Sequence, residues 1–237
     1  MIKLTNRQKE DRQDELCKHP DESYSREIGQ LISQTLKKGN KVFCATDWHL
    51  WQKDKEHPTV CHKRRNFDEI IKNVTSTIGK DGTLIFLGDL VDGEFRDKDS
   101  LKNVLLALPG QKVLVRGNND LFEYSYYRSC GFRNVTRAFV WSNILFSHFP
   151  TKNDNDVNVH GHIHNYKSYY IPYTNQIDVA YLDGRTKPVE LMKVIKTQPA
   201  YSKLIKECPE HFNEYTSLFD EVMLSNPDCF IPDPYES

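Results

Sequence analysis

Five short blocks of Asp, Asn and His residues stand in order along this chain of 237 residues. Carboxylate, amide oxygen and imidazole groups are the side chains that bind divalent metal ions. Because apolar stretches alternate with these blocks, we expect the polar groups at strand ends, where α/β folds build their sites. The blocks are Asp47-Trp48-His49, Gly88-Asp89-Leu90-Val91-Asp92, Arg116-Gly117-Asn118-Asn119-Asp120, Ser147-His148 and Gly161-His162-Ile163-His164.

The spacing inside the first and last blocks suits a metal centre. Asp47 and His49 are two residues apart, so both side chains leave a strand end on the same side. The same parity lets His162 and His164 address adjacent metals. Asp89 leaves an apolar strand into a loop opened by glycine, where an unpaired buried charge would be costly. A cation removes that cost, which makes Asp89 the natural bridge between two metals.

Two further residues, one within the second block and one just before the last block, each have more than one candidate role. Asp92 either belongs to the site or bonds backbone amides and holds its own loop. His160 shares the parity of the last block, and we interpret it as a structural histidine or one that supports the ligands. Any single block would also suit an ordinary turn, so the prediction rests on the five together.

The elements that must position these blocks follow an α/β pattern. Runs rich in β-branched and aromatic residues predict strands, and apolar residues at a helical period predict helices. A first helix is expected to begin at Asp21 or Ser23 and to end at Gly39. The strands are predicted at residues 42–46, 83–87, 113–115 and 144–147, and two further helices at 67–74 and 100–108.

The chain divides into a central unit with an addition at each end. Residues 1–40 are predicted to form a polar arm plus a helix, residues 41–197 the catalytic-type domain, and residues 198–237 a helical extension. The apolar stripe within 201–224 either packs on its own domain or faces a partner. These additions could cover the site, form a homo-oligomer or bind a partner, and the sequence leaves these uses open.

Composition excludes several classes of protein. The net charge of -1 gives no global basic field of the kind that nucleic-acid binding usually produces. The six cysteines are scattered without a CxxC pair, so they predict reduced thiols and not a disulfide framework. No run of about 18 apolar residues occurs, and the start of the chain is polar. We therefore expect a soluble, cytoplasmic protein with no membrane partner.

The set D-x-H, G-D-x-x-D, G-N-x-D, S-H and G-H-x-H resembles the calcineurin-like metallophosphoesterase superfamily over roughly residues 41–195, in particular its small bacterial and phage members. The resemblance implies a four-layer α-β-β-α sandwich of two mixed sheets flanked by helices, with the metal site at strand ends. It also implies two divalent transition metal ions, with manganese expected first and iron, zinc or nickel as alternatives.

Carried over position by position, the resemblance implies two sets of ligands that share Asp89. The first metal would be held by Asp47, His49, Asp89 and His164, and the second by Asp89, Asn118, His148 and His162. Two such ions lower the pKa of a bridging water, so that a hydroxide attacks the phosphorus atom in line.

One position departs from the family pattern G-N-H-[DE]. Asn119 stands where the family has a histidine that protonates the leaving group, and an amide cannot supply a proton near pH 7. We expect a phosphodiesterase acting on a diester of nucleotide or nucleic-acid type. His57 or His62 could serve as the donor instead, or activity could be weak.

Asn119, Asp120 and Arg116 are the candidate catalytic residues. Arg116 either adds positive charge to the transition state or holds its loop. The basic residues 63–65 either contact a phosphate backbone or form a solvated face. The alternative functions are a phosphomonoesterase, including a protein phosphatase-like activity, and a metal-binding scaffold without catalysis.

Overall fold

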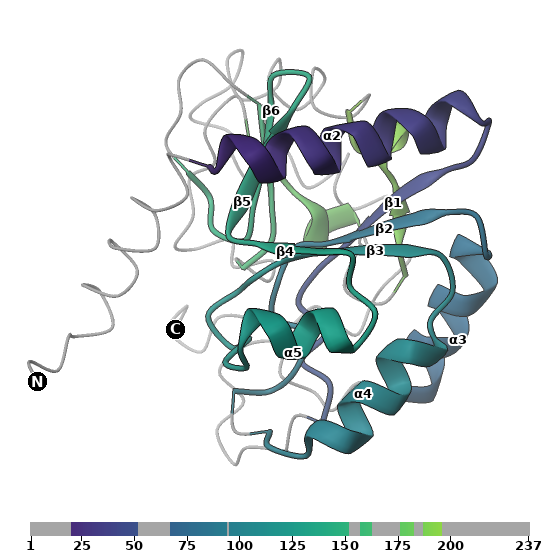
Figure 1. Ribbon diagram of the computed structural model, residues 1–237, viewed down its shortest axis with the longest axis vertical. Helices are drawn as coiled ribbons and strands as arrows, with labels where there is room; N and C mark the ends of the chain where they lie inside the picture. Colours follow the sequence, from purple (N-terminus) through teal and green to yellow (C-terminus); the bar gives the residue numbers. More distant parts are fainter. Residues whose placement is uncertain are drawn as a thin grey trace, which may run out of the picture.

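The fold is described from a computed structural model, in which residues 20–51, 67–93, 95–151, 157–162, 176–182 and 187–195 are described (Figure 1). Several predicted features lie outside these ranges and stay predictions. They are the polar arm in residues 1–19, His57, His62, the basic residues 63–65, His164 and the helix in 201–224.

The larger of two sheets has five strands in the order β4-β3-β2-β1-β9. The strands are β1 (Val42–Ala45), β2 (Thr83–Phe86), β3 (Gln111–Val115), β4 (Asn134–Thr136) and β9 (Val189–Glu190). β1 to β4 run parallel, and β9 pairs antiparallel with β1. Register places Ala45 beside Phe86 and Phe86 beside Leu114. The chain therefore leaves β1, β2 and β3 at one edge of the sheet, where the first three blocks begin.

The smaller sheet has the order β5-β6-β7-β8. Its strands are β5 (Ala138–Trp141), β6 (Ile144–Ser147), β7 (Val157–His160) and β8 (Gln176–Asp178). β5 and β6 form an antiparallel hairpin, whereas β6, β7 and β8 run parallel. The hairpin turns through Ser142 and Asn143, which have φ values of 49° and 63°. Two successive positive φ values suit the tight turn of a twisted hairpin.

The main apolar core lies between the two sheets. Phe139 of β5 and Phe146 of β6 stack with their ring centroids 4.6 Å apart. They pack with side chains of the five-stranded sheet such as Cys44, Ile85 and Val113. Because this sheet is also covered on its other face, its central strands are buried on both sides and read as continuous apolar runs.

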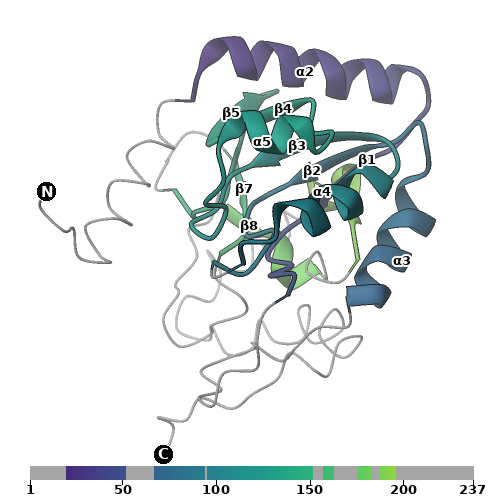
Figure 2. The ribbon, with the colours of Figure 1, turned by 60° about the horizontal axis from the view of Figure 1, so that its bottom comes forward.

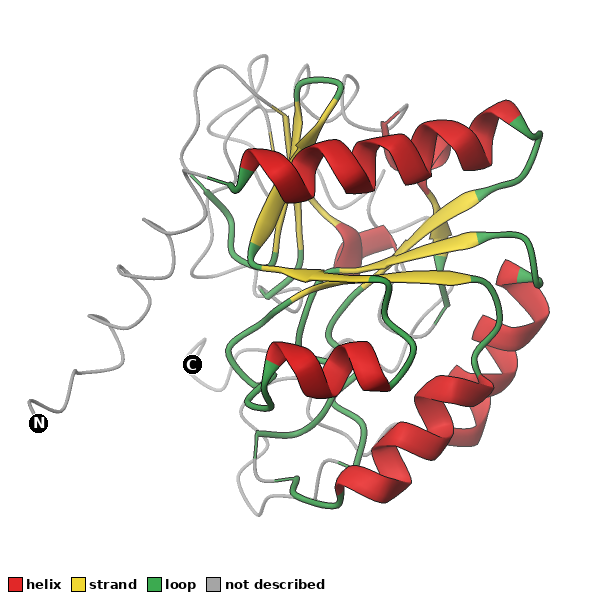
Figure 3. Ribbon diagram, in the orientation of Figure 1, coloured by secondary structure: helices red, strands yellow, loops and turns green. Residues whose placement is uncertain are grey.

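Three helices cover the other face of the five-stranded sheet, as Figures 1 and 3 show. They are α3 (Phe67–Ile78), α4 (Lys98–Ala107) and α5 (Tyr124–Ser129). Val74, Leu105 and Tyr127 from these helices pack in one cluster with Phe86 and Leu114 of the strands. The predicted helices at 67–74 and 100–108 are thus confirmed; α3 continues past its expected end to Ile78, whereas α4 begins earlier, at Lys98, and ends at Ala107.

Helix α2 (Glu22–Lys37) lies on the opposite side of the five-stranded sheet and runs beside β5 (Figures 1 and 2). Asp21 caps it, because its carboxylate accepts a hydrogen bond of 2.7 Å from the Ser23 N–H. The helix ends before Gly39, which has a φ of 76°. Its buried Ile28 and Ile32 belong to the core between the sheets, so α2 packs as part of the sandwich.

The chain therefore has the predicted α/β fold, with two mixed sheets flanked by helices. In the described ranges, no helix combines the length and the apolar character needed to cross a membrane.

Candidate metal centre

The predicted ligands other than His164, which lies outside the described residues, gather where strands of both sheets end. Asp47 follows β1, Asp89 follows β2 and Asn118 follows β3, whereas His148 follows β6 and His162 follows β7. Residues more than a hundred positions apart are thereby brought to one place. The backbone N–H of His162, for example, donates a hydrogen bond of 3.0 Å to Asp47 Oδ2.

The first group of ligand atoms comes from Asp47, His49 and Asp89, which are all buried. One potential ligand atom of each lies within 4.8 Å of the others. His49 Nε2 is 3.6 Å from Asp89 Oδ2 and 3.9 Å from Asp47 Oδ1. Two carboxylates and one imidazole facing a common point are a donor set that suits a divalent transition metal.

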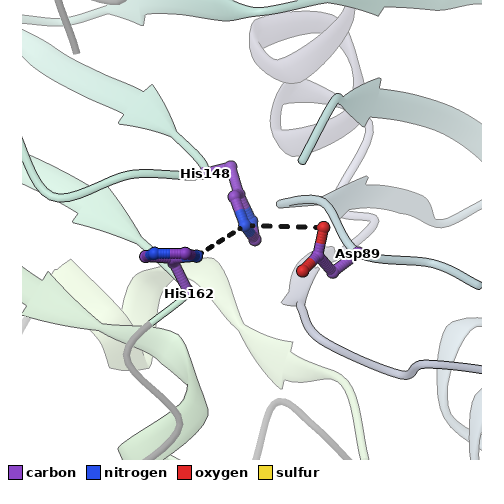
Figure 4. Close-up of side chains that lie close together, drawn as sticks. All are labelled: Asp89, His148 and His162. Atoms are coloured by element: carbon purple, nitrogen blue, oxygen red, sulfur yellow. Dashed lines mark hydrogen bonds and ion pairs between the residues drawn. The ribbon is translucent and has the colours of Figure 1, made fainter. Parts of the chain in front are cut away.

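The second group consists of Asp89, His148 and His162, shown in Figure 4. His148 Nε2 lies 3.6 Å from Asp89 Oδ1 and 3.2 Å from His162 Nδ1. The Oδ1 atom of Asn118 is also 3.1 Å from His148 Nε2. His148 Nδ1 is 2.7 Å from the Leu87 carbonyl. This contact orients the ring and leaves Nε2 to face the other three residues.

Asp89 belongs to both groups and divides its two oxygens between them. Oδ2 is the atom near His49, and Oδ1 is the atom near His148. A carboxylate that turns one oxygen to each of two neighbouring ligand sets has the arrangement of a bridge. This geometry supports the prediction that Asp89 links two metal sites.

Four of these residues have backbone conformations that are unusual for non-glycine residues. Asp47, His49, Asp89 and His162 have φ values of 52°, 44°, 57° and 73°. Such conformations cost free energy and cluster at functional sites, where the surrounding structure holds them. Here the two carboxylate loops support each other, because the Asp47 and His49 amides donate to the carbonyls of Gly88 and Asp89 at 2.9 Å and 3.0 Å.

Glycines allow the loops to approach closely. An added Cβ at Gly88 would lie 2.5 Å from His148 Nδ1, and one at Gly117 would lie 2.2 Å from Asp89 Oδ1. At Gly161, a Cβ would lie 1.9 Å from Thr46 Oγ1. All three distances are far shorter than a van der Waals contact, so these positions have no room for a side chain.

The electrostatics of the site favour a bound cation. Burial raises the pKa of Asp89 to about 7, and the nearby Asp47 and Asp120 carboxylates add to this rise, against the opposing effect of His148. Burial alone would lower the pKa of His148, but Asp89 and Asp47 bring it above its ordinary value. Buried carboxylates that repel one another are stabilised by positive charge. The donor set and the charge both therefore fit a divalent metal.

The block at residues 116–120 holds the site together in ways that the sequence did not specify. The Asp120 carboxylate accepts hydrogen bonds from the backbone amides of Asp89, Leu90 and Gly117 at 2.9 Å, 3.0 Å and 2.8 Å. Arg116 donates through its guanidinium to the Asp120 carbonyl and lies over the Tyr124 ring. Of the two roles considered for Arg116, this geometry favours holding the loop.

Three residues outside the two ligand groups complete the description of the site. His160 is fully buried with its Nδ1 2.8 Å from the Gly161 carbonyl, and burial lowers its pKa to about 4, as suits a structural neutral imidazole. Asp92 is buried and is in neither ligand group. Thr46 was missed: its hydroxyl donates to Asp47 Oδ2 at 2.7 Å. A threonine at a strand end carries no sequence signal for such a role.

Three comparisons relate the chain to known proteins. A family model described as calcineurin-like phosphoesterase matches residues 41–223. A search of curated proteins finds no match. Among solved structures, a protein of unknown function from Aquifex aeolicus, AQ665, is 24% identical with a TM-score of 0.49, over 67% of this chain and 99% of its own. Pseudomonas putida nuclease MPE is 18% identical with a TM-score of 0.40, over 53% of this chain and 62% of its own.

Proposed function

The chain belongs to the calcineurin-like phosphoesterase family, and we propose that it is a metal-dependent phosphodiesterase with two metal ions. The observation that carries this proposal is the shared carboxylate of Asp89, which faces one ligand group with each oxygen. Oδ2 of this carboxylate lies 3.6 Å from His49 Nε2, and Oδ1 lies 3.6 Å from His148 Nε2. A nucleotide or nucleic-acid type diester is the substrate class that we propose.

Seven residues are the proposed metal ligands. Asp47, His49, Asp89 and His164 would hold the first ion, and Asp89, Asn118, His148 and His162 the second. Imidazole-rich ligation favours a transition metal over magnesium or calcium, and we propose manganese, with iron, zinc or nickel as alternatives. Two such ions supply a water of lowered pKa and neutralise charge on phosphoryl oxygens.

The proposed preference for diesters rests on Asn119. This residue contacts the shared carboxylate, with its amide nitrogen 2.6 Å from Asp89 Oδ2. An amide is no proton donor near pH 7, so it gives no general-acid help to a poor leaving group. Monoesters with poor leaving groups should suffer most from this loss, which leaves a nucleotide or nucleic-acid type diester as the substrate class that we propose.

The test is an assay of the purified chain with manganese against bis-p-nitrophenyl phosphate and p-nitrophenyl phosphate. We expect the diester to be hydrolysed faster, and we expect Asp89→Asn and Asn118→Ala to abolish both rates. Asp81→Asn is the matched control, because Asp81 is exposed before β2 begins and so lies at the opposite end of that strand from Asp89.

The outcomes separate the candidate functions. Hydrolysis of neither compound above the Asp89→Asn level would refute the enzymatic proposal and leave a metal-binding scaffold of this fold. Faster hydrolysis of the monoester would refute the diester preference and point to a phosphomonoesterase. Loss of activity in Asp81→Asn would show that the variants act through folding and not through the metal site.

A further inference from the structure

Asn119 makes two hydrogen bonds to one carboxylate. Its backbone N–H donates to Asp89 Oδ1 at 2.8 Å, and its side-chain amide donates to Asp89 Oδ2 at 2.6 Å. The two oxygens of Asp89 are thus each held by a donor from the same residue. The ionised form of Asp89, which is the form that binds a metal ion, only accepts hydrogen bonds, and the Asn119 amide turns its NH2 group toward it.

This pair of bonds fixes how the Asp89 carboxylate is rotated. With both oxygens held, Oδ2 stays toward His49 and Oδ1 stays toward His148. A rotation about the Cβ–Cγ bond would take both oxygens out of their ligand groups. The Asp120 carboxylate fixes the backbone of Asp89 at the same time, through the 2.9 Å bond from the Asp89 amide.

Gly93 completes the arrangement from the other side of the amide. A Cβ added at Gly93 would lie 2.6 Å from Asn119 Oδ1, which is too short for any contact without displacement. The contact is with the side-chain amide, since the next nearest atoms are Cγ and Cβ of Asn119 at 3.5 Å and 3.8 Å. A side chain at position 93 would therefore push the amide out of the position from which it reaches Asp89.

We propose that Asn119 is a positioning residue for the bridging carboxylate of Asp89, and that Gly93 is the steric partner that keeps its amide in place. This role rests on the proposed two-metal centre. It differs from proton donation, because it acts through Asp89 and before any substrate is bound. It also gives a reason for an amide at position 119: the NH2 group holds Asp89 while the oxygen faces Gly93.

The experiment measures metal binding without substrate. Manganese is titrated calorimetrically into wild type, Asn119→Ala, Gly93→Ala and the double variant. Residues that orient metal ligands typically contribute about 10- to 100-fold in affinity, so we expect Asn119→Ala and Gly93→Ala each to weaken binding by about 10-fold or more. The double variant should bind no more weakly than Asn119→Ala, because the added methyl group then has no amide to displace.

Electron paramagnetic resonance of the manganese-loaded proteins gives a second readout. Two manganese ions that share a carboxylate give an exchange-coupled signal, and isolated ions give a six-line signal. We expect the coupled signal in wild type and a shift toward the six-line signal in both single variants. Gly29→Ala is the matched control: it adds the same methyl group in α2, near Trp141 and not at a metal ligand.

Wild-type affinity and an unchanged spectrum in Asn119→Ala would overturn the proposal, as would fully additive losses in the double variant. Asn119→Ala carries the test by itself if Gly93→Ala does not fold, since Asn119 is half-buried and truncation only removes atoms. These results are separable from activity. If wild type hydrolyses no diester but the variants lose metal, the proposed activity fails while the positioning role stands.

Discussion

Replacing Gly88 with alanine would test how closely the two halves of the metal centre pack. Gly88 has a φ of 91°, and an added Cβ would lie 2.5 Å from His148 Nδ1 and 2.6 Å from the Gly117 nitrogen. A left-handed conformation costs an alanine about 1–2 kcal/mol, and overpacking adds about 1–3 kcal/mol. We therefore expect Gly88→Ala to lower the free energy of unfolding by about 2–5 kcal/mol.

Gly39→Ala separates the two contributions. Gly39 has a similar φ of 76°, but nothing lies within 4 Å of its added Cβ. It should therefore lose only the backbone contribution, about 1–2 kcal/mol. The entropy that alanine removes from the unfolded chain is common to both variants and cancels in the comparison. The difference between the two variants, about 1–3 kcal/mol, measures the packing between Gly88, His148 and Gly117.

The assay is urea unfolding followed by circular dichroism in EDTA, so that metal binding does not contribute to the measured free energy. The reasoning predicts a lower midpoint for Gly88→Ala than for Gly39→Ala. It also predicts weaker manganese binding in Gly88→Ala alone, because the clash displaces the His148 ring. Equal midpoints and equal metal affinities in the two variants would refute this account of how the site is packed.

Three further changes test other parts of the structure. Because the Asp89 pKa is raised to about 7, the folded state keeps a proton on Asp89 that the unfolded state releases near pH 4. Thermal unfolding in EDTA should therefore show that Asp89→Asn gains stability relative to wild type as the pH rises from about 4 to 7. Added manganese should reverse this order of stability. Asn119→His, assayed at saturating manganese, should raise hydrolysis of phenyl phosphate, whose leaving group needs a proton, by about 10-fold or more, since a proton donor contributes about 10²- to 10⁴-fold; no gain would contradict the proton-donor argument. Ile32→Ala in α2 should cost about 2–5 kcal/mol in urea unfolding, whereas Leu106→Ala, at a side chain 54% exposed, should stay within about 0.5 kcal/mol; a small effect at Ile32 would show that α2 is dispensable.

Sequence reasoning located the elements that are apolar and continuous. β1, β2 and β6 were predicted because each is buried along its length and reads mainly as an apolar run, and β3 was predicted from its buried apolar residues 113–115. β7 was missed because its second residue is Asn158. That side chain is buried and satisfied by Thr151, Ser147 and Leu145, so a polar residue interrupts the pattern without being exposed.

The site was predictable as a set of residues but not as a set of contacts. The predicted ligands that fall within the described residues lie where strands end, as expected for polar residues that follow apolar runs. The roles of Arg116 and Asp120 depend on backbone atoms: Asp120 accepts from the Asp89 amide in another loop, and Arg116 donates to the Asp120 carbonyl within its own loop. Residue spacing does not reveal such contacts. The same holds for Gly93, whose importance comes from Asn119 lying against it in space.

Helix α2 could be predicted as a helix, but its packing partners could not. The helix was predicted from local signals, with Asp21 or Ser23 as the expected cap, and the structure places Asp21 there; such signals act within a few residues. Its partners are long-range: Ser25 Oγ accepts from the Val140 amide at 3.1 Å, and Trp141 donates to Ser33 Oγ at 3.2 Å. An amphipathic face shows that a helix packs, but not on which strand.

The most direct test of the central claim is a crystal structure of the manganese-loaded chain with anomalous scattering recorded. The account predicts two peaks, one among Asp47, His49 and Asp89 and the other among Asp89, His148 and His162, with the Asp89 carboxylate between them. A single peak, or two peaks that do not share Asp89, would contradict it.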